Sequence, residues 1–189
     1  MFVNSHCSTT QRLRENYVRA INRLRKVDIY GECGGIFGRI MCPRHSEKCA
    51  KHLGHYKFYL AFENAICPDY VTEKYWDSVP VGAIPVVFGG KTFKGLAIPG
   101  SYIDALKFSN AESLVKYLEY LDRNDTAYNE YFTWKKFYQK SYLEPWPCRL
   151  CRMIHDDSLP ERTYRNFQKY LDPNPACRIN LKHLQIYTH

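Results

Sequence analysis

Short apolar segments alternate with helix-forming patterns through most of this chain, and the alternation limits the folds open to it. Strands are predicted at residues 2–4, 27–30, 56–62, 84–88 and 102–106. Between the first two, apolar residues from Leu13 to Leu24 recur at i, i+4, i+7, i+8 and i+11, which predicts one face of a helix. Further helices are predicted at residues 71–79, 111–123 and 126–142. We therefore expect an α/β fold with a mostly parallel, Rossmann-like sheet.

Ligands of open parallel sheets bind beyond the carboxyl ends of the strands, which here are the turns at residues 5–10, 63–72 and 89–94. The formal net charge of +8 suits an anionic partner. Neither GxGxxG nor GxxxxGK[ST] occurs, so the usual dinucleotide and ATP fingerprints are absent from the sequence. Nucleic acid is not expected as a partner, because no zinc finger, RNP sequence or basic cluster interleaved with aromatic residues is present. A basic domain of this kind must hold its anion in another way.

The sequence contains eight cysteines, which favour an oxidising compartment or a metal site. They are Cys7, Cys33, Cys42, Cys49, Cys67, Cys148, Cys151 and Cys177, and all but the first are disulfide candidates. Only one CxxC pair occurs and no second pair follows at zinc-finger spacing, so disulfides are favoured over zinc and no metal site is predicted. The Asn124-Asp125-Thr126 sequon fits a lumenal setting. No run approaches the roughly 18 apolar residues of a membrane span, and the first residues do not form a signal-peptide pattern.

The sequence divides into a predicted domain at residues 1–144 and an extended tail at residues 145–189, which is rich in prolines and charges. Within the domain, residues 32–54 are predicted to be an irregular, cross-linked insertion. An aromatic run at residues 128–142 is interpreted as core packing, with a sugar-binding platform as the less favoured alternative.

Five consecutive residues at positions 70–74, Tyr-Val-Thr-Glu-Lys, carry the most specific chemistry. They are predicted to open a helix, whose N-terminal N–H groups and Lys74 would favour a phosphate. Glu73 can accept two ribose hydroxyls, and Tyr70 offers a flat face to a base. Glu63 and Asn64 follow the preceding strand at the same edge. An ordinary capped helix with a surface Glu–Lys pair explains the same residues, and the pattern alone does not decide between the two.

The segment at residues 56–90, YKFYLAFENAICPDYVTEKYWDSVPVGAIPVVFGG, closely resembles the signature of the α1,3-fucosyltransferases of glycosyltransferase family 10. Weaker likeness extends across most of the chain. Residues 5–14 resemble the family's SNxxxxxARxR turn and helix, and residues 27–31 resemble its VDVYG strand. The Cys148–Cys151 pair resembles a C-terminal CxxC that forms disulfides in relatives.

This resemblance implies a GT-B fold of two Rossmann-like domains, of which this chain would be the C-terminal one that binds GDP-fucose. The implied reaction is an inverting transfer of fucose to a GlcNAc residue of an N-glycan or another glycoconjugate, in α1,3 linkage. The implied donor-binding residues are Arg12, Glu63, Asn64, Tyr70, Val71, Thr72, Glu73 and Lys74. Arg12 and Lys74 would stabilise the departing diphosphate, so that no metal or other cofactor is required. Glu73 would bind the ribose and Tyr70 the guanine, while Asn64, with Glu63 beside it, would face the fucose.

Family members also carry an N-terminal acceptor domain with a carboxylate general base, preceded by a stem and a membrane anchor that places them in the Golgi lumen. No such segment precedes Met1, so we expect the general base to come from outside this chain. The alternative expectation is a truncated, catalytically inactive fragment that binds GDP. One local departure from the family pattern is Pro80, which is expected to end or kink the predicted helix at residues 71–79.

Overall fold

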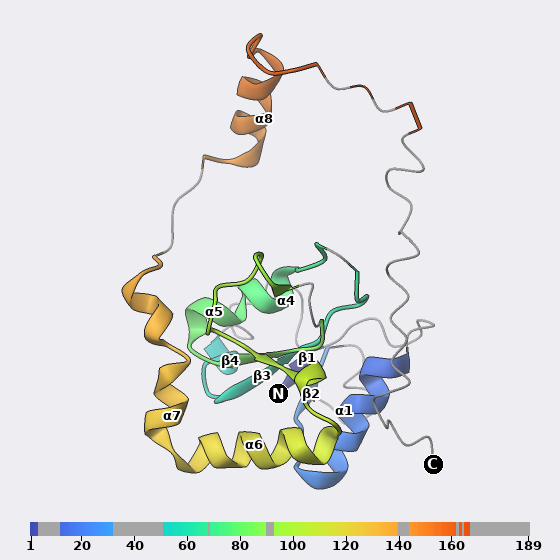
Figure 1. The fold of residues 1–189 in the computed structure, drawn as a ribbon, viewed down its shortest axis with the longest axis vertical. Coiled ribbons are helices and arrows are strands. Elements are labelled where there is room, and N and C mark those ends of the chain that lie inside the picture. The colour runs from blue at the N-terminus through green and yellow to red at the C-terminus, as the bar shows by residue number, and fades with distance from the viewer. Residues whose placement is uncertain are drawn as a thin grey trace.

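The computed structural model describes residues 1–3, 12–31, 51–67, 69–89, 93–139, 144–161, 163 and 165–166, and it describes residues 12 and 13 by their backbone alone. These residues form a five-stranded sheet of order β2-β1-β3-β4-β5, in which every strand pair is parallel (Figure 1). The strands are β1 (Phe2–Val3), β2 (Ile29–Tyr30), β3 (Phe58–Ala61), β4 (Ile84–Val87) and β5 (Ile103–Asp104). The α/β fold with a parallel sheet is therefore confirmed.

Alternate strand residues supply two separate cores, as the pleat of a sheet buried on both faces requires. Leu60 and Val86 point to the core beneath α1 (Arg12–Leu24) and α6 (Ala111–Arg123). Their neighbours Tyr59 and Val87 point to the second core. Tyr75, from α4 (Glu73–Trp76), is fully buried in that second core. In Figure 1, α4 and α5 (Ser78–Val81) lie across the sheet from α6.

The single helix predicted at residues 71–79 is wrong, because α4 and α5 are separate helices of four residues that meet at Asp77. Pro80 explains the break, since its ring nitrogen cannot donate to the carbonyl of Trp76 in a continuous helix. In α5 it lies in the first turn, where no donor is needed. Gly82 then ends α5 with a φ of 83°. Because α4 is so short, its dipole carries no argument for anion binding.

The long helix predicted at residues 126–142 is also wrong, because α7 (Asp125–Glu130) is followed by a 3-10 helix, η3 (Thr133–Lys136). The hydroxyl of Thr133 donates to the carbonyl of Glu130, which offers the backbone an alternative to another helical turn. Core packing is confirmed for Tyr128, Tyr131 and Phe132, which pack against the first core. Phe137 is 80% exposed, so that interpretation does not extend to it.

Residues 146–154 form a helix, α8 (Trp146–Ile154), where an extended tail was predicted. Its large apolar side chains, including Trp146 and Ile154, are exposed. Cys148 and Cys151 are free and exposed, so the structure does not pair them. Cys67 is disulfide-bonded, and the other candidates, Cys33, Cys42, Cys49 and Cys177, lie outside the described residues. No helix in the described part of the chain has the length and apolar character to cross a bilayer.

The hydroxyl of Tyr17 is buried in the first core without a hydrogen-bond partner among the described residues. Its ring packs against Phe62 and Phe88, with centroid distances of 6.1 and 5.2 Å. We expect Tyr17→Phe to raise the free energy of unfolding at pH 7 by about 1 kcal/mol, because a buried hydroxyl with no partner costs free energy. Urea denaturation measures this change. Tyr75→Phe is the control, since the Tyr75 hydroxyl is 2.7 Å from Ser101 Oγ and accepts from the Ile98 N–H at 2.8 Å, and its loss should destabilise the fold.

The same variant has an expected pH dependence. Burial, with a smaller contribution from the charge of Asp104, raises the pKa of Tyr17 from 10.0 to about 12. Between these two values the unfolded chain loses this proton while the folded chain keeps it, so the wild type loses stability as pH rises through that window. The free energy of unfolding of Tyr17→Phe should therefore exceed that of the wild type by a margin that grows from pH 10 to pH 12. An advantage that is flat or shrinks across this window contradicts the assignment.

Candidate functional site

The strand order reverses between β1 and β3, and this is where a parallel α/β sheet binds its ligands. From β1 the chain moves outward to β2, and then returns to the other side of β1 through β3, β4 and β5. Glu63 and Asn64 lie two and three residues past the carboxyl end of β3. Sheet topology therefore points to the same residues as the sequence pattern, through an independent argument.

The carboxylate of Glu63 is buried, with 1% of its side chain exposed, and both of its oxygens accept hydrogen bonds from Thr72. The Thr72 N–H donates to Oε1 at 2.7 Å. The Thr72 hydroxyl lies 2.9 Å from Oε1 and 2.7 Å from Oε2. Thr72 is in turn the N-cap of α4, where its hydroxyl oxygen accepts from the Lys74 N–H at 3.4 Å. Through these hydrogen bonds, Glu63 connects the end of β3 to the start of α4.

The ammonium of Lys74 lies between two carboxylates. Its Nζ is 3.0 Å from Glu73 Oε1 and 3.7 Å from Glu63 Oε2, and it donates to the Thr72 hydroxyl oxygen at 3.4 Å. The Lys74 side chain is 15% exposed, whereas that of Glu73 is 67% exposed. A mostly buried cation with an exposed partner can exchange that partner for an anionic ligand.

The carboxyl group of Glu73 is charged at neutral pH. Its partial burial acts to raise its pKa, but the hydrogen bond from Lys74, the backbone of Glu73, the Lys74 charge and Thr72 together lower it below the ordinary value of 4.5. An exposed carboxylate at this edge can accept hydrogen bonds from the hydroxyls of a sugar.

Arg14 is buried in the first turns of α1, with 4% of its side chain exposed, and it holds Asn64 in place. Its Nη1 donates to Asn64 Oδ1 and, at 3.4 Å, to the carbonyl of Phe62, while its Nε lies 2.7 Å from Glu15 Oε1. An arginine can only donate, so the Asn64 oxygen faces Arg14 and the amide N–H groups are left to donate elsewhere. Arg14 is not among the site residues predicted from the sequence, since a basic residue in a helix usually lies on a solvated face. Its spacing of three residues from Tyr17 and seven from Ile21 puts it instead on the buried face.

The family model described as glycosyltransferase family 10 (fucosyltransferase) C-term matches residues 1–170. The chain belongs to glycosyltransferase family 10. It is 39% identical over 169 residues to "Alpha-(1,3)-fucosyltransferase C" of Drosophila melanogaster, a match that covers 88% of this chain and 38% of that relative. It is 38% identical over 140 residues to "GDP-fucose protein O-fucosyltransferase 3" of Xenopus laevis, which covers 71% of this chain and 30% of that relative. The chain thus spans well under half the length of either protein.

A solved structure of an α1,3-fucosyltransferase with GDP resembles the chain with a TM-score of 0.56 and 26% identity. The similar region covers 70% of this chain and 37% of the solved one. The parallel sheet described above is therefore a fold that occurs among fucosyltransferases.

In this family 10 chain, the structure brings together four of the residues singled out from the sequence, namely Glu63, Thr72, Glu73 and Lys74, whereas Asn64, next to Glu63 in the chain, contacts Arg14. Tyr70 is half-buried, and Val71 packs against the second core. The backbone of Arg12 begins α1, but its side chain lies outside the described residues, so its role stays a prediction. Among the described residues, no group of three or more His, Cys, Asp or Glu side chains is placed to hold a metal ion.

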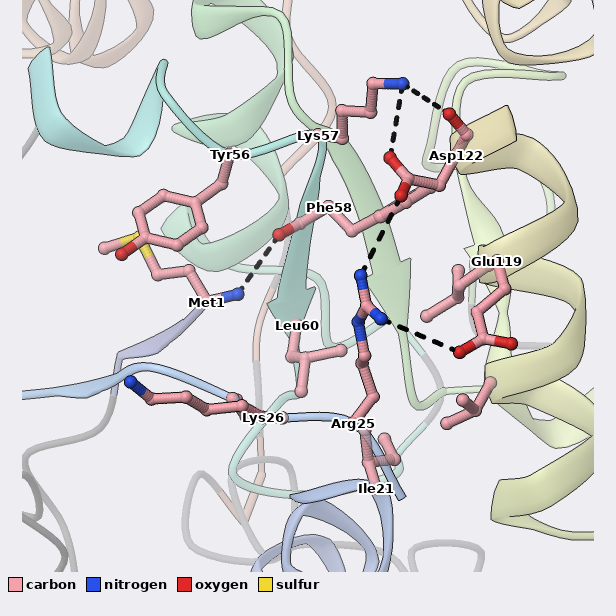
Figure 2. Close-up of a pocket in the computed structure, with 13 residues that line it drawn as sticks. Met1, Ile21, Arg25, Lys26, Tyr56, Lys57, Phe58, Leu60, Glu119 and Asp122 are labelled. Carbon is pink, nitrogen blue, oxygen red and sulfur yellow. Dashed lines mark hydrogen bonds and ion pairs between the residues drawn. The ribbon is translucent and has the colours of Figure 1, made fainter. Parts of the chain in front are cut away.

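A cavity of about 190 Å³ lies at the other end of the strands, between the sheet, α1 and α6. Lys57, which precedes β3, lines it (Figure 2). Glu63, in contrast, lies past the other end of β3. The cations at its rim are already matched by carboxylates. Lys57 Nζ is 3.2 Å from an Asp122 oxygen, and Arg25 is 3.9 Å from both Asp122 and Glu119. This cavity is separate from the candidate site and is not arranged to receive an anion.

Proposed function

We propose that this chain supplies the donor site of a fucosyltransferase, which binds GDP-fucose and holds the diphosphate through Lys74. The single observation that carries this proposal is the mostly buried Lys74 ammonium at the topological switch point, beside the exposed carboxylate of Glu73. Glu73 would turn to the ribose hydroxyls, and Tyr70 would contact the guanine. Membership of family 10 and the "GDP-fucose" in a relative's name support this choice of donor.

In the proposed reaction, an acceptor hydroxyl attacks C1 of fucose from the face opposite GDP and inverts the configuration there. The bond from C1 to the phosphate oxygen breaks, and negative charge grows on the departing GDP. A fixed cation aimed at that charge stabilises the transition state. Lys74 provides it, with Arg12 as a second cation, so we propose that no metal ion is required. The amide N–H groups of Asn64, whose oxygen is occupied by Arg14, would donate to the sugar or its phosphate.

The proposed acceptor is a GlcNAc residue of an N-glycan or another glycoconjugate, in α1,3 linkage. A second candidate acceptor is a protein hydroxyl, because the chain is about as similar to a protein O-fucosyltransferase as to an α1,3-fucosyltransferase.

Glu63 is not a candidate for the general base, since its carboxylate is buried and accepts hydrogen bonds from Thr72. We propose that the base comes from outside the described residues.

The setting proposed for the full enzyme is the Golgi lumen, with a membrane anchor supplied from outside the described residues. The disulfide at Cys67 supports an oxidising compartment. The sequon residue Asn124 is a possible glycan attachment site. Its Oδ1 caps α7 by accepting from the Ala127 N–H at 3.0 Å, and its Nδ2 donates to the Tyr120 hydroxyl at 3.2 Å. A glycan on Nδ2 would leave the cap in place.

Release of GDP from GDP-fucose, measured with alternative acceptors, tests the proposal. When the protein also includes the domain that supplies the base, we expect release in the presence of a glycan that carries GlcNAc, and little release with a folded protein that lacks glycans. Release with the protein alone would favour the protein hydroxyl as the acceptor. GDP binding without release under any condition would support the alternative, an inactive GDP-binding fragment. No binding and no release would contradict the proposal.

A further inference from the structure

Glu63 was expected to face the fucose together with Asn64, but its carboxylate is turned toward the start of α4. Thr72 uses both of its donors on Glu63, the backbone N–H and the hydroxyl. With 1% of its side chain exposed, Glu63 has no open surface to offer a ligand. Its oxygens contact Thr72 and Lys74, which lie nine and eleven positions further along the chain.

The geometry points to Glu63 as a positioning residue that fixes Thr72 and Lys74 for the diphosphate without touching the donor. This inference rests on the proposed function, since the position of Lys74 matters because it binds GDP. A buried carboxylate is stable only when paired and hydrogen-bonded, so it resists displacement once its partners are in place. The partners here are Thr72, which is the N-cap of α4, and Lys74, which is the cation of the site. Glu63 therefore holds both residues near the end of β3.

The same arrangement specifies which contact changes when the donor binds. Without a ligand, Lys74 lies near two carboxylates, so the group of Glu63, Glu73 and Lys74 carries a formal charge of −1, which disfavours a diphosphate. Glu73 is 67% exposed and free to turn toward a ribose, whereas Glu63 is held by Thr72. Donor binding exchanges the Glu73–Lys74 pair for a phosphate contact and leaves Glu63 with Lys74. The remaining pair is neutral and keeps the ammonium in position.

The test compares the affinities of GDP and GDP-fucose, measured by calorimetry, in the wild type and in Glu63→Gln. A positioning residue acts through Lys74 on the diphosphate, which the two ligands share. We therefore expect Glu63→Gln to weaken both ligands about tenfold and to leave the ratio of their affinities unchanged. A residue in contact with fucose would weaken GDP-fucose more than GDP. A changed ratio, or wild-type affinity for both, overturns the inference.

Thr72 provides the conservative pair of variants. Thr72→Ser keeps the hydroxyl and should bind GDP within about threefold of the wild type, whereas Thr72→Val should lose about tenfold. In Glu63→Gln/Thr72→Val the two losses should not add, because both variants break the same contact. Additive losses would contradict the positioning role. Ser113→Ala removes the capping box of α6 far from the site, and it controls for lost stability because GDP affinity should not change.

The failure of this inference can be distinguished from the failure of the proposed function. A folded wild type that binds no GDP contradicts the proposed function. The contact itself is then tested by a double-mutant cycle on the free energy of unfolding in the ligand-free chain. A coupling free energy between Glu63→Gln and Thr72→Val supports the contact by which Glu63 positions Thr72. Strictly additive effects on the free energy of unfolding overturn it.

Discussion

Lys74→Ala is expected to weaken GDP binding by about 100-fold or more, which would place it beyond detection in a standard titration. A hydrogen bond to a charged group contributes about 1.5–3 kcal/mol, and its loss accounts for most of this effect. The rest follows because Glu63 and Glu73 lose the cation between them, so that two uncompensated carboxylates face the diphosphate. Isothermal titration calorimetry of the variant and the wild type measures the change.

The matched control is Lys116→Ala, which makes the same change in net charge on the exposed face of α6. Lys116 is 72% exposed and pairs with Glu112 at 2.8 Å. Its removal should leave GDP affinity within about twofold, because charges exposed to solvent are strongly screened. If both variants weaken binding equally, the affinity arises from overall charge rather than from a site at Lys74.

Arg14→Ala is expected to lower the free energy of unfolding by about 2–3 kcal/mol and also to weaken GDP-fucose binding. The stability loss follows because Glu15 and the carbonyl of Phe62 lose a charged partner in a buried position. The binding loss follows because nothing else described here fixes the orientation of Asn64. Urea denaturation and calorimetry measure the two effects.

Arg123→Ala, in the last turn of α6 and with an exposed side chain, is the control for the loss of an arginine. It should change the free energy of unfolding by less than about 0.5 kcal/mol. Equal effects of the two variants would mean that burial of Arg14 contributes nothing to the stability of α1. Unchanged binding by a folded Arg14→Ala variant would remove Asn64 from the proposed donor contacts.

The parallel sheet could be predicted from the sequence because its central strands β3 and β4 lie in short apolar runs, residues 58–62 and 83–88, that are bounded by polar residues or glycine. Residues 59–61 and 84–87 are buried on both faces, so periodicity, β-propensity and burial all indicate the same structure there. The candidate site was also predictable, because Glu63 and Asn64 lie just beyond the carboxyl end of one of these strands. Local sequence carries this information, and the switch point of the sheet adds to it.

The remaining features depend on contacts that local patterns do not encode. The turn of Glu63 toward Thr72 joins residues nine positions apart, so the sequence could place Glu63 at the site but not give its direction. Arg14 was not predicted as a site residue, because a charged side chain within a basic segment gives no local sign of burial, although its spacing from Tyr17 places it on the buried face. The division of residues 71–79 into α4 and α5 was only partly foreseen, since Pro80 predicted that the helix would end or kink at that residue, whereas the break lies at Asp77.

Calorimetric titration of the folded wild-type chain with GDP tests the central claim most directly. Circular dichroism and a cooperative thermal transition first establish that the chain is folded. The account predicts saturable binding at about one site per chain and a rise in the melting temperature with GDP concentration, as linkage requires. Neither heat of binding nor a thermal shift in a folded chain would contradict the assignment of a donor site at Lys74.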